Sequence, residues 1–152
     1  MQPLNRRLIL AGIAISVLPL AACSQRESWA SDAAPAKESP AQVVKIEGSE
    51  LSRVTLSEKA IQRIDLKTVE VREQEVDGTA RKVVPYSSLI YDGKGRTWIY
   101  TSPEPRTFVR QQVNVLRIDG DSVFLSDGPA AGTVVASVGV AELYGAETGV
   151  GH

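Results

Sequence analysis

Residues 82–144 read KVVPYSSLIYDGKGRTWIYTSPEPRTFVRQQVNVLRIDGDSVFLSDGPAAGTVVASVGVAELY, and this stretch decides the fold. Short runs rich in β-branched and aromatic residues alternate with clusters of Gly, Pro and Asp at nearly regular spacing. This pattern is typical of antiparallel strands joined by tight turns. The expected strands lie at residues 97–100, 107–118, 122–125 and 133–138, with 107–118 and 122–125 pairing across the turn at 119–121.

The preceding segment adds further elements to this sheet. Residues 53–56 read as a short strand, and Ser57 is a good N-cap for a short helix ending near Ile64. Residues 66–72 then alternate, with Val69 and Val71 on one face. We therefore predict a mainly β domain over residues 51–145. It is a small antiparallel roll or partly closed barrel of six or seven strands with one short α-helix at 57–64.

The two ends of the chain have a different character. Residues 140–144 suit one short helical turn, and the glycines that follow predict a flexible tail over 146–152. Residues 24–50 are rich in Ala, Ser, Pro and charge and bury little apolar surface, so we expect residues 23–50 to form a disordered linker.

Residues 1–22 have the features of a bacterial export signal. Arg6 and Arg7 precede a short apolar run at 8–18, which is shorter than the roughly 20 residues that a spanning helix needs. The following Leu-Ala-Ala-Cys at 20–23 resembles a lipobox. That resemblance implies removal of 1–22 and attachment of acyl chains such as palmitate to Cys23. The alternative is an ordinary signal peptide with a chance cysteine. We expect a lipid-anchored, extracytoplasmic protein, on the periplasmic side in a Gram-negative cell.

Composition argues against several classes of function. The formal net charge is −1 and the pI is about 5.9, so no extended positive field would attract nucleic acid. The one cysteine excludes an internal disulfide, and the one histidine, His152, leaves no Ser-His-Asp or Cys-His set. The one methionine, Met1, leaves with the signal. We therefore expect no enzyme, no cofactor and no metal site.

A group of aromatic and basic side chains is the main candidate for a partner-binding surface. Trp98 and Tyr100 share one side of their strand, and Phe108 can lie beside them on a neighbour. Either they form the core of the sheet, which we favour, or they face a partner. Arg106 and Arg110 have two interpretations as well. They are solvated, or they face anionic headgroups or an acidic partner.

Several of these short sequences, taken in order, resemble one family. The series Val84-Pro85-Tyr86, Asp92-Gly93, 97–100, 108–110, Gly120-Asp121 and Val134-Val135 looks like the end of the membrane-proximal domain in periplasmic adaptor subunits. These membrane fusion proteins belong to tripartite efflux pumps of the resistance–nodulation–division type. Residues 54–57, 62–64 and 66–68 resemble the first pass of the same domain.

In that family a β-barrel, a lipoyl-like domain and a helical hairpin separate the two passes. Here only residues 73–81 join them. The resemblance implies a non-enzymatic, lipid-anchored accessory component of an efflux system, with an inner-membrane transporter or a full-length adaptor as its partner. The alternative is a free-standing envelope lipoprotein that binds a small ligand or a cell-envelope polymer.

Overall fold

The computed structural model describes residues 39–149. The expected signal at 1–22, Cys23 and most of the expected linker therefore lie outside the described residues. Within 39–149 the fold is mainly β and antiparallel, a half-barrel with short helices, as predicted from the sequence. The strands are β1 (Ala41–Lys45), β2 (Ser52–Leu56), β3 (Lys67–Glu70), β4 (Arg72–Val76), β5 (Thr79–Pro85), β6 (Ile90–Tyr91), β7 (Thr97–Glu104), β8 (Thr107–Asp119), β9 (Ser122–Asp127) and β10 (Val134–Val138). The helices are α1 (Glu58–Arg63) and α2 (Val140–Thr148), with a 3₁₀ turn, η1, at Tyr86–Ser88.

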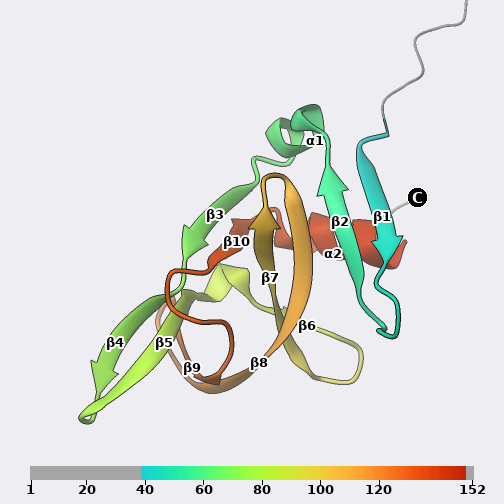
Figure 1. The fold of residues 1–152 in the computed structure, drawn as a ribbon. Helices are drawn as coiled ribbons and strands as arrows, with labels where there is room; N and C mark the ends of the chain where they lie inside the picture. Colours follow the sequence, from blue (N-terminus) through green and yellow to red (C-terminus); the bar gives the residue numbers. More distant parts are fainter. Residues whose placement is uncertain (1–38, 150–152) are drawn as a thin grey trace, which may run out of the picture. The chain divides into compact units, whose positions relative to one another are not determined.

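Seven of the strands form one continuous path in the order β3-β10-β7-β8-β9-β5-β4 (Figure 1). The two ends of this path, β3 and β4, are consecutive in sequence and meet at Val71. The Val71 amide donates to the Thr133 carbonyl at 2.9 Å, and the Gly132 amide donates to the Val71 carbonyl at 2.8 Å. The sheet therefore curls until its first and last strands are joined through a single buried residue.

Strand β8 belongs to two parts of the sheet. Its first half pairs with β7 and β2, and its second half pairs with β9. The register shifts between Asn114 and Val115, and again between Val115 and Arg117. Such bulges bend a strand and increase its twist, which lets one long strand turn the corner of the half-barrel.

The curled sheet has an apolar cluster on each face. The helix-side cluster lies against α1 and α2 and comprises Val54, Leu56, Ala60, Tyr100, Phe108, Ala136, Val140 and Leu143. The barrel cluster comprises Val71, Val84, Ile99, Val113, Val123, Leu125 and Val135. Neighbours such as Ile99 and Tyr100 enter opposite clusters because successive side chains of a strand point to opposite faces.

Helix α1 begins as the sequence predicts. The Ser57 hydroxyl accepts a hydrogen bond from the Ala60 amide at 3.2 Å, and Ile64 ends the helix. Because α1 has only six residues, packing of Ala60 and Ile61 against the helix-side cluster holds it in place.

The structure corrects the expected bounds at both ends of the domain. Residues 41–45 fall in the expected linker, yet they form β1, which pairs with β2 over five residues, and Ala41 packs on the helix-side cluster. Helix α2 continues to Thr148 and so takes up part of the expected tail, although Gly145 lies within it. Buried contacts of Leu143 and Glu147 compensate for the weak helix propensity of that glycine.

The segment expected only to join the two passes is itself structured. Strands β4 and β5 form a hairpin around Asp77 and Gly78, whose φ values of 52° and 73° match a type I′ turn. The extension of the expected helical turn at 140–144 to Thr148 and this hairpin are additions to the predicted fold, and its antiparallel, partly closed character stands.

Candidate functional site

The residues proposed as a partner-binding surface are mostly interior. Trp98, Tyr100 and Phe108 are buried, as the favoured core interpretation predicts, and Arg110 is buried with them. Arg106 alone lies at the surface, in the turn between β7 and β8. The five residues therefore do not form one exposed patch on this chain.

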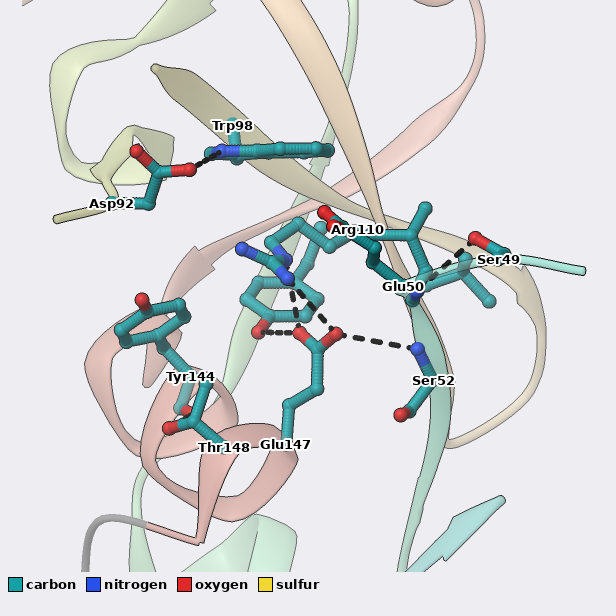
Figure 2. Close-up of polar contacts among 12 residues, drawn as sticks. Ser49, Glu50, Ser52, Asp92, Trp98, Arg110, Tyr144, Glu147 and Thr148 are labelled. Atoms are coloured by element: carbon teal, nitrogen blue, oxygen red, sulfur yellow. Dashed lines mark hydrogen bonds and ion pairs between the residues drawn. The ribbon is translucent and has the colours of Figure 1, made fainter. Parts of the chain in front are cut away.

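Arg110 takes part in a buried polar cluster with Tyr100 and Glu147 (Figure 2). The Tyr100 hydroxyl donates to Glu147 Oε2 at 2.6 Å, and Arg110 Nη2 donates to Oε1 at 3.3 Å. Arg110 Nε lies 3.1 Å from Oε2 as an ion-pair contact, without the alignment of a hydrogen bond. The Glu147 side chain is only 3% exposed, so this carboxylate depends on these partners for its solvation.

The polar cluster joins four elements. Tyr100 comes from β7, Arg110 from β8 and Glu147 from the last turn of α2. The Ser52 amide at the start of β2 donates to Glu147 Oε1 at 3.3 Å. One carboxylate thus connects the C-terminal helix to three strands that are distant from it in sequence.

Aromatic rings enclose the arginine. The Arg110 guanidinium carbon lies 4.4 Å from the centre of the Trp98 ring and 5.4 Å from that of Tyr144 (Figure 2). Arg96 lies over the Trp98 ring at 5.0 Å. Such cation–π contacts are strongest when the cation is shielded from water, as Arg110 is.

Asp92 accepts a hydrogen bond from the indole N–H of Trp98. Its Oδ2 accepts from the Trp98 indole at 3.0 Å and from Arg96 Nε at 2.7 Å. Its Oδ1 accepts from the amides of Lys94 and Arg96 at 2.9 and 3.0 Å. The 92–95 segment is therefore an Asp-stabilised hairpin turn between β6 and β7, as a cluster of Gly and Asp between two strands predicts.

Two groups in this region have shifted pKa values. Burial raises the pKa of the Tyr100 hydroxyl above its ordinary value, and its hydrogen bond to the Glu147 carboxylate raises the pKa further. Burial alone would raise the pKa of Asp92, but hydrogen bonds from the Arg96 amide, the Trp98 indole and the Arg96 side chain outweigh it. The net effect lowers the pKa of Asp92 well below its ordinary value.

The polar cluster is built to position α2. The Glu147 carboxylate is occupied by donors from Tyr100, Arg110 and Ser52, so it has little capacity left to act as a general base. Our expected tail at 146–152 missed Glu147. The signal for it was the spacing of Val140, Leu143 and Glu147, which places the three side chains on one face of a helix.

Elsewhere, the described residues form a partly open hollow beside α1. It has a volume of about 300 Å³ and is lined by Glu58, Lys59, Gln62 and Arg106. Its lining is charged and polar. Residues 39–149 contain no group of three or more His, Cys, Asp or Glu side chains placed to hold a metal ion. No helix in the same range is long and apolar enough to cross a bilayer.

Cys23, the expected lipidation site, lies outside the described residues. No family model, curated protein or solved structure matches this chain.

Proposed function

We propose that this chain is a non-enzymatic, lipid-anchored accessory component of an efflux or export system. It is held on the extracytoplasmic face of the membrane through Cys23 and docks on an inner-membrane transporter or a full-length adaptor. The observation that carries the proposal is how the two segments resembling the adaptor family fit together. Strand β2 pairs with β8 and β3 pairs with β10, so both segments share the same ladders.

The helix-side cluster supports the same view. Val54 and Leu56 come from the first segment, and Tyr100, Phe108 and Ala136 come from the second. Both segments contribute to a single core, as two passes through one domain would. Where the family carries further domains, this chain has the β4–β5 hairpin, which closes the gap with a two-residue turn.

The alternative of a ligand-binding lipoprotein predicts a concave, mostly apolar pocket. The hollow beside α1 is partly open and is lined by charged and polar side chains. It gives that alternative no specific support.

The test is affinity capture of the tagged chain from chemically cross-linked native membranes. We expect an inner-membrane transporter or an adaptor subunit among the captured proteins. A Cys23→Ser chain is the matched control, because it removes the acyl acceptor and leaves residues 39–149 unchanged. Capture should fall with the control if docking depends on tethering. Recovery of no transport component with the acylated chain would contradict the proposal, and so would an N-terminal peptide that carries no fatty acid.

A further inference from the structure

Strand β1 has an open hydrogen-bonding edge. Within residues 39–149 it pairs with β2 alone, and it lies on the outer side of β2 (Figure 1). Its register with β2 is antiparallel, from Ala41 opposite Leu56 to Lys45 opposite Ser52. In such a pair, alternate residues direct their amide and carbonyl groups towards the partner, and the others direct theirs away.

The hydrogen bonds around β1 identify which residues point outward. The Ser57 amide donates to the Pro40 carbonyl at 3.0 Å, and the Ile46 amide donates to the Leu51 carbonyl at 3.1 Å. Even-numbered residues of this strand therefore bond to β2. Backbone groups of Ala41, Val43 and Lys45 accordingly face the open edge.

Strand β2 shows the complementary pattern. The Leu56 amide donates to the Arg106 carbonyl at 2.9 Å, and the Ser52 amide donates to Glu147, so both point away from β1. The Ala41 carbonyl accepts from the Ser39 hydroxyl at 2.8 Å, which leaves one of its two lone pairs for another donor.

The centre of this edge is apolar and exposed. Val43 is 41% exposed and Val44 is 61% exposed, and Lys45 is the one charged residue of the strand. The two end strands of the seven-strand path differ from β1 in this respect, because they carry more charged residues. Strand β3 carries Lys67 and Glu70, and β4 carries Arg72, Glu73 and Glu75. Charged side chains along an edge discourage pairing with another chain, and β1 lacks that protection at its centre.

We propose that β1 is a self-association site, at which the β1 strands of two copies of this chain pair antiparallel about a two-fold axis at Val43. In this register Val43 lies opposite its own copy, and Ala41 lies opposite Lys45 of the other copy. All three outward-facing residues are then paired, giving about six backbone hydrogen bonds between the copies.

The sequence of β1 is compatible with this register. Gln42 lies opposite Val44 of the second copy, so the exposed Val44 gains a neighbour on its face of the sheet. Lys45 lies opposite Ala41, and Glu47 lies opposite Ser39, so no like charges face each other. The contact is small, and we expect weak association in solution that tethering to a membrane strengthens by raising the local concentration.

The test is hydrogen–deuterium exchange of the full chain, read at single amides at about 10 μM and about 1 mM. Exchange at Val43 and Lys45 should be measurably slower at the higher concentration, since no residue among 39–149 accepts a hydrogen bond from these amides in the monomer. In a monomer–dimer equilibrium this slowing cannot exceed about tenfold over a hundredfold concentration range, and a weak dimer gives less. Exchange at Gln42 and Val44, which already bond to β2, should change far less. Equal rates at both concentrations would overturn the proposal, as would protection centred on another strand.

Two variants make the test specific. Val43→Lys places two ammonium groups opposite each other and should abolish the concentration dependence. Val138→Lys on β10, where the valine is 39% exposed, is the matched control and should retain it.

Val43→Pro is a second variant. It removes an outward-facing amide, so it should leave the β1–β2 ladder intact while removing the central bonds between copies. Persistent association of both Val43 variants would refute pairing through β1. This inference depends on the β1 edge alone and is independent of the proposed transport partner.

Discussion

Replacing Glu147 with alanine would leave the Arg110 guanidinium buried without its counter-ion and the Tyr100 hydroxyl without its acceptor. Removing one member of a buried ion pair typically costs about 3–5 kcal/mol. We expect Glu147→Ala to lower the free energy of unfolding by about that amount, measured by urea denaturation. The double variant Arg110→Met/Glu147→Leu should recover much of the loss, because both desolvated charges are then gone.

The control for this prediction lies on the same helix. Glu142 is exposed in the first turn of α2, where a carboxylate gains only about 0.3–1 kcal/mol from the helix dipole. Glu142→Ala should therefore cost no more than about 1 kcal/mol. A loss of equal size in the two single variants would show that the polar cluster does not hold α2 in place.

At the residue scale, the sequence predicts partners that are close along the chain better than distant ones. Ser57 caps α1 through an amide three residues away, and Asp92 organises a turn through the amides of Lys94 and Arg96. Both features follow from local chemistry. Glu147 bonds to Ser52, 95 residues away, and no local pattern identifies that partner. Arg110 is buried because it contacts Glu147, which is also distant in sequence, whereas most arginines lie at the protein surface.

At the scale of elements, the β4–β5 hairpin is the part of the domain most tolerant of change. Most of its residues are exposed, and it projects from the rest of the sheet (Figure 1). Inserting about ten Gly and Ser residues between Asp77 and Gly78 lengthens a surface loop. This insertion should lower the free energy of unfolding by only about 1–2 kcal/mol, because loop closure costs about 0.6 kcal/mol per doubling of loop length. Chemical denaturation would measure this cost.

An equal insertion between Gly120 and Asp121 is the matched control. That turn joins β8 and β9, and the Asp121 carbonyl accepts from the Tyr86 amide at 2.8 Å, so the turn is held by a contact outside the hairpin. The control insertion should be clearly more destabilising. If both insertions cost the same, the β4–β5 hairpin is not the permissive site that its exposure suggests.

The elements that the sequence predicts are those bounded by turn residues. Clusters at 92–95, 119–121 and 127–129 delimit β7, β8, β9 and β10. The same turn signal was present at Asp77-Gly78, but the residues on both sides are mostly charged and polar and lack the apolar alternation that would identify two strands. Strand β1 has a weaker signal, the Gly48-Ser49 turn that joins it to β2. The strand is stabilised by its pairing with β2 and by the packing of Ala41, which are not apparent from the local sequence.

At the scale of the whole molecule, the two apolar clusters are parts of one cooperative structure. Strand β7 contributes Tyr100 to the helix-side cluster and Ile99 to the barrel cluster. Strands β8 and β10 contribute to both clusters in the same way, through Phe108 with Val113 and Ala136 with Val135. Neither cluster can lose its packing without distorting strands that support the other.

We therefore expect a single unfolding transition for residues 39–149. Trp98, which contacts Arg110 under α2, reports on the helix-side face by its fluorescence, in a Trp29→Phe chain that leaves one indole. The methyl signals of Val123 report on the barrel cluster. The two probes should give the same midpoint and slope in urea, as a two-state transition requires. Loss of the Trp98 signal at a lower urea concentration would instead mean that α2 and its face of the sheet unfold first. The half-barrel would then be stable without its C-terminal helix.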